Sequence, residues 1–165
     1  MRRHLASRGL PIVSLVMVLL ALVRIAAAAD ATYSFELLGP QITNSSSGAS
    51  IAMTGAGSFN ATTGTVVASG SFAQFNANGS IAAHGMWSAT SFVSFDSFGG
   101  PNPGLQGGQF VMIVTLFPKG GPPQTGLSMS VTCLVGSPPP GAIEGITIGN
   151  FTTPVRGHTL FHLNH

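Results

Sequence analysis

Glycine and proline interrupt this 165-residue chain so often that most of it has no room for a long helix. All but one of its 22 glycines, and all but one of its 11 prolines, lie after residue 30. In a helix interior, Pro costs about 3 kcal/mol and Gly about 1 kcal/mol relative to Ala. The runs between them are short, rich in Phe, Val, Ile and Thr, and alternate apolar with polar residues, as half-buried strands do. The chain from residue 30 onward is therefore predicted to be all-β.

Eight such runs are expected to form strands, and short turns join most of them. Because short connections favour antiparallel neighbours, the strands should pair in chain order. Asn and Gly residues in the segments 60–64 and 76–79 are typical of hairpin turns. The prediction is a small antiparallel meander β-barrel, or a strongly curled β-sandwich, of about eight strands. The expected strands are 33–38, 49–59, 65–75, 80–95, 109–117, 126–135, 142–148 and 155–163.

A glycine two residues before an aromatic recurs at Gly57, Gly70 and Gly85. If Phe75 pairs with Ser80 across the second turn, Gly70 lies opposite Gly85, where paired glycines would let the sheet bend. The run 80–95 is long for one strand, so we expect a bulge near residues 90–92. The same register places several apolar residues on the core side: Phe72, Ile81, Trp87 and Val93.

The first 29 residues have the organisation of a helical secretory signal peptide. Three arginines precede an apolar run from Ile12 to Val23, and the small residues 26–29 follow it. Cleavage is predicted after Ala29, which leaves residues 30–165 as a single secreted β-domain. The alternative is an uncleaved membrane anchor. That alternative is disfavoured because the run of roughly 12 residues falls short of the roughly 20 needed to span a bilayer.

Loss of the leader would reverse the sign of the net charge. The whole chain carries a formal charge of +2, but four of its six cationic side chains lie in the leader. The remaining chain has two cationic side chains, Lys119 and Arg156, and four carboxylates, which gives a net charge of −2. A chain without a basic cluster cannot neutralise phosphates, which argues against a nucleic-acid partner. Its uncharged β edges suggest self-association.

The sequence contains no pattern of residues that indicates acid–base catalysis or metal binding. The carboxylates Glu36, Asp96 and Glu144 lie on different segments, and no serine motif opens a helix. On an extended strand His158 and His162 would be about 13 Å apart, too far to share a metal. No catalytic residue, metal ligand or cofactor is therefore predicted. A small secreted enzyme remains an alternative if His84 or His158 met Asp96 or Glu144 at the barrel mouth, as does a membrane-embedded β-barrel.

Cys133 is alone in the chain, so it cannot form an intrachain disulfide. Because Cys133 falls on the apolar face of its run, we expect an inert core thiol. Four Asn-x-Ser/Thr sequons are expected in loops or turns, and the sequence leaves their glycosylation open: Asn44, Asn60, Asn78 and Asn150.

These features favour an extracellular, non-catalytic module that binds a small apolar ligand or contacts other surface components. A barrel of this size either fills with side chains or holds one small ligand. The residues predicted to line an interior ligand site are Phe72, Trp87, Met112 and Met129.

Overall fold

The structure, a computed structural model, describes residues 31–164. The predicted signal peptide, its cleavage after Ala29 and residues 30 and 165 of the predicted domain lie outside the described residues. Within the described part, no helix is long and apolar enough to cross a membrane.

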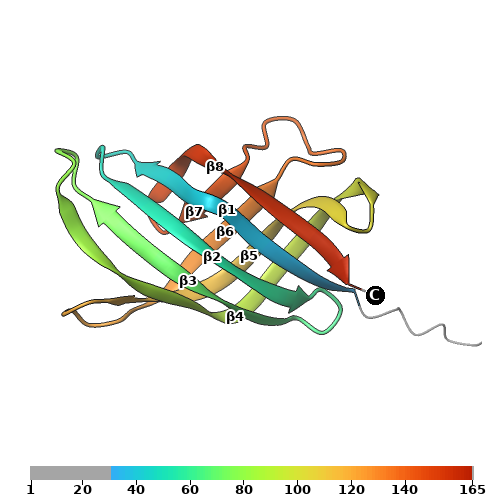
Figure 1. Ribbon diagram of the computed structural model, residues 1–165, viewed down its shortest axis with the longest axis horizontal. Coiled ribbons are helices and arrows are strands. Elements are labelled where there is room, and N and C mark those ends of the chain that lie inside the picture. The colour runs from blue at the N-terminus through green and yellow to red at the C-terminus, as the bar shows by residue number, and fades with distance from the viewer. Residues whose placement is uncertain (1–30, 165) are drawn as a thin grey trace, which may run out of the picture.

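Eight antiparallel strands form a closed barrel in chain order, which confirms the predicted barrel (Figure 1). Each strand pairs with the next along the chain, and β8 returns to pair with β1. The strand bounds are β1 Thr32–Ser45, β2 Ser50–Asn60, β3 Thr65–Phe75, β4 Ile81–Asn102, β5 Leu105–Pro118, β6 Gln124–Cys133, β7 Gly145–Ile148 and β8 Phe151–Asn164.

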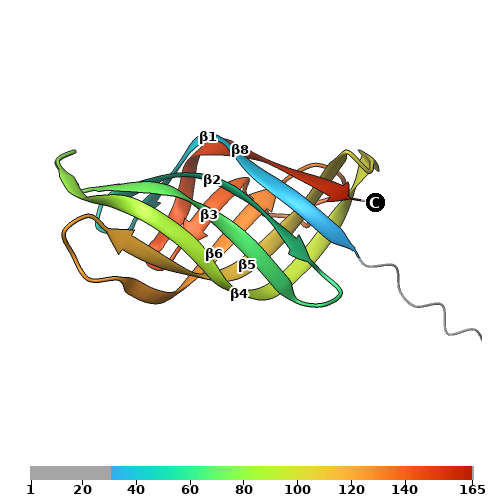
Figure 2. The same cartoon turned by 60° about the horizontal axis from the view of Figure 1, so that its bottom comes forward.

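The strands tilt across the barrel, and the two ends of the described chain lie side by side. Thr32 at the start of β1 pairs with Asn164 at the end of β8. Figures 1 and 2 both show β1 and β8 as neighbours along their length. Closure of this kind removes the long open edges of a flat sheet.

The predicted register between β3 and β4 is wrong by two residues along most of the pair. Gly70 lies opposite Trp87, and Phe72 lies opposite Gly85, so Gly70 and Gly85 are not partners. The register shifts between Gln74 and Phe75, which pairs with Ile81. An irregularity of this kind inserts extra residues into one strand, and alternation along the sequence does not reveal it.

Bulges in β4 also change which residues face inward. The expected bulge near residues 90–92 is confirmed, because the register with β5 shifts between Ala89 and Ser91. A second shift follows between Phe92 and Ser94 and leaves Val93 between them, on the outside. Ile81 and Val93 are therefore 64% and 52% exposed, and their predicted place on the core side is wrong. Phe72 and Trp87 do face inward, as predicted.

The core on the β2–β3 side is built around Trp87. Its indole Nε1 donates a hydrogen bond of 2.9 Å to the carbonyl of Thr54 on β2. The ring crosses Gly55 and Gly70, which pair with each other on β2 and β3. A Cβ on Gly70 would overlap the Thr54 carbonyl that accepts this bond. Glycine at position 70 therefore leaves the space through which the Trp87 indole on β4 reaches the backbone of β2.

Aromatic rings fill the interior around the start of β1 and the end of β8. The rings of Phe59 and Phe110 stack with their centroids 4.0 Å apart. Phe35 meets Phe110 edge-on at 5.5 Å, and Phe161 meets Phe95 edge-on at the same distance. These separations are those of rings in direct contact. We call this group the aromatic cluster: Tyr33, Phe35, Phe59, Phe92, Phe95, Phe110 and Phe161.

The barrel closes differently where β7 lies. β7 has only four residues and pairs with β8 at a single position, Ile148 with Phe151. Two side-chain hydrogen bonds join neighbouring strands there. Thr43 donates from its hydroxyl to the carbonyl of Ile146, and Thr159 donates to the carbonyl of Thr132. We call this part, where β1 and β8 meet β6 and β7, the closure seam.

Candidate functional site

All four residues predicted to line an interior ligand site lie in the barrel core. Phe72, Trp87, Met112 and Met129 are at most 3% exposed. Each packs within one continuous hydrophobic core, and none of them lines the outer hollow described below. Their burial is what core packing requires, and their role as ligand contacts stays a prediction.

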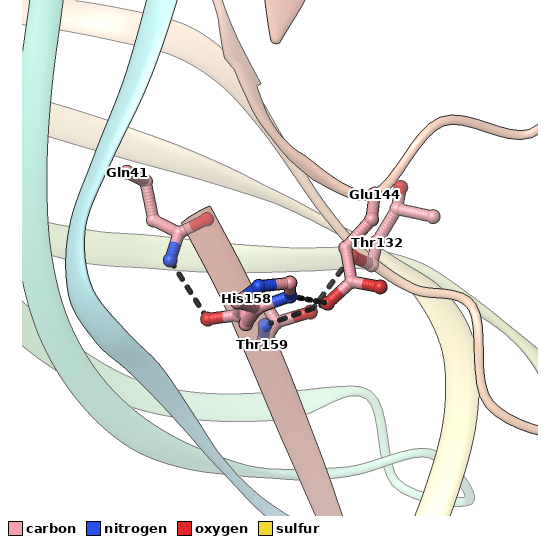
Figure 3. A network of polar contacts seen from close by, with 5 residues as sticks. All are labelled: Gln41, Thr132, Glu144, His158 and Thr159. Atoms are coloured by element: carbon pink, nitrogen blue, oxygen red, sulfur yellow. Dashed lines mark hydrogen bonds and ion pairs between the residues drawn. The ribbon is translucent and has the colours of Figure 1, made fainter. Parts of the chain in front are cut away.

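A polar network at the closure seam brings Glu144 and His158 together (Figure 3). His158 Nδ1 lies 3.3 Å from Glu144 Oε1, and the backbone N–H of Thr159 donates to the same oxygen at 3.2 Å. Gln41 on β1 donates from its side-chain amide to the carbonyl of His158 at 2.7 Å. Thr159 completes the network through its 2.7 Å bond to Thr132 on β6. The network thus joins β1, β6 and β8 to the loop that precedes β7.

The chemistry that this network can perform is limited by where its members lie. The side chain of His158 is 81% exposed, so water surrounds the imidazole. Glu144 is 26% exposed and accepts a hydrogen bond from the backbone of Thr159, which gives it a structural role. Among the described residues, the imidazole of His158 contacts the Glu144 carboxylate and no hydroxyl that could act as a nucleophile. The contact between the two side chains therefore lies at the surface, where β8 meets the loop that precedes β7.

Cys133 is buried beside this network and has no disulfide partner, which confirms the predicted core thiol. Burial raises the pKa of the thiol above its usual range, although a backbone hydrogen bond with Val135 acts in the opposite direction. The negative charge of Glu144 raises the pKa further, and a hydrogen bond with Thr159 lowers it. A thiol held protonated in this way is a poor nucleophile at neutral pH.

The other carboxylates and histidines singled out in the sequence do not contact one another. Glu36, Asp96 and His84 are on the surface, and His162 Nδ1 contacts the carbonyl of Gly104. Among residues 31–164, no three His, Cys, Asp or Glu side chains gather as a metal site would require.

The four sequons differ in their surroundings. Asn78 and Asn150 lie exposed in turns, as predicted. Asn44 instead lies within β1, where it pairs with Ser50 and Thr153, so its predicted place in a loop is wrong. Asn60 ends β2, and its side-chain oxygen caps the following turn by accepting from the N–H groups of Thr62 and Thr63.

Outside the barrel, a hollow of about 410 Å³ lies over β5, β6 and β7. Its floor is the outward face of these strands, and its walls are residues 141–143 and the first part of β8. We call it the outer hollow. None of the residues that line it is charged. Half of them carry a side-chain hydroxyl or amide: Gln109, Ser128, Ser130, Thr132, Thr147 and Thr152.

Two buried polar atoms near this side of the barrel have no hydrogen-bond partner, Ser130 Oγ and Gln41 Oε1. Ser130 belongs to the floor of the outer hollow, whereas Gln41 points into the closure seam against Gly157. Most buried polar groups in proteins are paired, so the Gln41 oxygen has unused capacity to accept, and the Ser130 hydroxyl has unused capacity to accept or donate.

Sequence reasoning did not identify the outer hollow. The alternation in 126–135 did place Ser128, Ser130 and Thr132 on one polar face. What the sequence could not show is that residues 141–143 rise beside this face and enclose it. No local pattern specifies how the connection between β6 and β7, residues 134–144, folds back over a neighbouring strand.

The barrel's packed hydrophobic core and neutral outer hollow define the class of molecule, a closed eight-stranded barrel with a polar depression on its side. Comparisons with protein-family models, with curated proteins and with solved structures found no match for this chain.

Proposed function

We propose that this protein is an exported, non-catalytic binding module that contacts other surface components through the outside of its barrel. The observation that carries the proposal is the packing of aromatic rings inside the barrel. Stacked rings such as Phe59 and Phe110 occupy the space in which a small barrel would hold an apolar ligand. The interface must then lie outside, where the outer hollow provides concave surface.

The scarcity of charge supports the same proposal. Beyond the predicted leader, the chain has six charged side chains, and no cluster of them appears in the outer hollow. A partner bound by such a surface is held by hydrogen bonds and apolar contact. Salt weakens interactions between exposed charges and has much less effect on these contacts.

Co-sedimentation of the exported protein with cell envelopes from its producing organism tests this function. We expect binding that changes little between about 0.05 M and about 1 M NaCl, because ionic screening has few charge pairs to act on. Failure to sediment with envelopes at either salt concentration would overturn the proposal.

A titration with palmitate tests the competing prediction, an apolar ligand inside the barrel. Trp87 is the only tryptophan of the chain and is 1% exposed in the core. An interior ligand would displace its neighbours and change its fluorescence. We expect no change, and a saturable change would favour the interior site and the residues predicted to line it.

Export is tested by the mass of the protein recovered outside the cytoplasm. The proposal expects an N-terminus at or next to Asp30. An intact Met1 would overturn cleavage and favour the anchor.

The contact between Glu144 and His158 supports a second candidate, an enzyme. A catalytic role would require turnover of a simple ester such as p-nitrophenyl acetate, lost on His158→Ala. Equal slow turnover by wild type and variant would exclude this pair as the catalytic group for that reaction.

A further inference from the structure

We propose that the outer hollow is a binding site for a neutral carbohydrate. This inference rests on the proposed function, because it assigns a ligand class to the same outer surface. It follows from the arrangement of donors and acceptors, the absence of charge, and the apolar walls.

Three adjacent strands supply the floor in register. Ser130 on β6 lies between Val111 on β5 and Thr147 on β7. Two residues further along, Thr132 lies between Gln109 and Gly145. Successive rows of a sheet present side chains on the same face at regular spacing. The floor therefore offers neutral hydrogen-bonding groups in two dimensions, as a ligand with many hydroxyls requires.

The floor groups retain bonding capacity. Ser130 Oγ is buried and has no hydrogen-bond partner. Ser128 and Thr147 form no side-chain hydrogen bond among those found in the described residues. A hydroxyl can both donate and accept, so each can match either role of a sugar hydroxyl.

The lack of charge selects against ionic ligands. A phosphate or carboxylate that lost water in this hollow would find no cation among the lining residues. Burying an unpaired charge is far more costly than burying a hydroxyl that gains a hydrogen bond. The site therefore favours a neutral ligand over its charged analogue.

The walls add apolar surface to these polar groups. Ile143 is 61% exposed at the rim, and it faces a hollow with a volume within the range of about 300–1,000 Å³ typical of small-molecule sites. A pyranose ring has C–H faces as well as hydroxyls, so it would use both kinds of surface. A purely apolar ligand would leave the floor hydroxyls unpaired. The apolar lining residues are Val111, Ala142, Ile143 and Pro154.

The test is chemical-shift mapping of the exported protein with maltose, cellobiose and chitobiose. We expect at least one sugar to shift the amide signals of Ser128, Ser130 and Thr147. Glucose 6-phosphate, as a charged sugar, should cause much smaller shifts. Absence of shifts with all three neutral sugars, or shifts confined to another face, would overturn the inference.

A double variant, Ser128→Ala with Thr147→Val, removes two floor hydroxyls while nearly keeping side-chain volume. It should weaken binding of that sugar at least about tenfold. The matched control is Ser69→Ala with Thr125→Val, two exposed positions that do not line the hollow, and its binding should equal that of wild type. Unchanged Trp87 fluorescence would show that both variants fold. Unchanged affinity in the floor variant would overturn the inference.

The envelope assay separates this failure from failure of the proposed function. If the floor variant sediments with envelopes as wild type does and the sugars do not bind, the carbohydrate inference fails and the binding module stands. If wild-type protein does not sediment at all, the proposed function fails.

Discussion

At the scale of single residues, Gly157 on β8 packs directly against the side chain of Gln41 on β1. Gly157 adopts a φ of +134°, a backbone conformation that side-chain-bearing residues rarely adopt. A Cβ there would also overlap the carboxamide of Gln41, which is fully buried. Gly157 is therefore required both by its backbone and by its neighbour across the closure seam.

Gly157→Ala should lower the free energy of unfolding by at least about 2 kcal/mol, because strain adds to the displacement of a buried amide. Urea unfolding followed by Trp87 fluorescence measures it. The control is Gly120→Ala, which has a φ of +81° but no atom near the added Cβ, and should cost only about 1–2 kcal/mol. The cost at Gly157 should fall in a Gln41→Ala background. Equal costs in both backgrounds would contradict the overlap with Gln41.

The buried thiol of Cys133 makes a second residue-scale prediction, on pH. Its pKa is raised in the folded state, mainly by burial, so the thiol deprotonates more easily after unfolding. The contribution to stability is complete below the unfolded pKa of about 8.5–9. It is lost as the pH rises from there through the folded value, because only the unfolded state releases the proton.

Cys133→Val should remove this part of the alkaline loss. The measurement is the free energy of unfolding of wild type and variant, with reductant present, from about pH 7 to above about pH 9. The difference between the two proteins should be constant at the lower pH values and shift in favour of the variant above about pH 9. A constant difference throughout would contradict the raised pKa.

At the scale of elements, Glu144 links two segments. It lies in the connection between β6 and β7, and its carboxylate is hydrogen-bonded to β8. Its carboxylate accepts from the backbone of Thr159, which is 1% exposed and would otherwise have one fewer partner. The contact with His158 adds little, because that imidazole is 81% exposed. The carboxylate therefore matters as a hydrogen-bond acceptor.

Glu144→Ala should cost about 1–3 kcal/mol and speed hydrogen exchange at the Thr159 amide. Glu144→Gln keeps an acceptor oxygen and should cost less, and His158→Ala should cost no more than about 1 kcal/mol. Urea unfolding and amide exchange measure these effects. An equal loss in the His158 and Glu144 variants would contradict the backbone role and favour the ion pair.

At the scale of the whole molecule, the closed barrel brings the two ends of the described chain together, so we expect its fold not to depend on which turn holds the chain ends. Thr32 and Asn164 pair across β1 and β8, so a short Gly/Ser linker can join the ends of the described domain. The Asn76–Gly79 turn is exposed and supplies a place for new termini.

A circular permutant that opens between Asn78 and Gly79 should fold to the same barrel. It should show the buried Trp87 emission and one cooperative unfolding transition in urea. The control opens between Val111 and Met112 in β5, where Met112 is fully buried, and should not fold. Loss of the cooperative transition in the first permutant would show that closure depends on chain order.

The sequence by itself determined the elements of this barrel. Alternation located β3 at Thr65–Phe75, and the Asn and Gly turns on either side of it predicted its antiparallel neighbours. Burial of Cys133, Phe72 and Trp87 also followed from alternation, because the two faces of a strand are a local property. β1 and β4 were predicted too short because Gly39, Pro40 and the glycines near 100 resemble strand ends, whereas the barrel continues through them.

Only the tertiary structure decided register, closure and the candidate sites. The shift at Phe75 and the exposure of Val93 depend on bulges set by partner strands, which no alternation within one strand encodes. Glu144 and His158 meet because the connection before β7 folds against β8. The outer hollow likewise exists because residues 141–143 stand beside the hydroxyls of β6. Contacts between distant segments arise when the closed barrel packs, so they cannot be predicted from local sequence patterns.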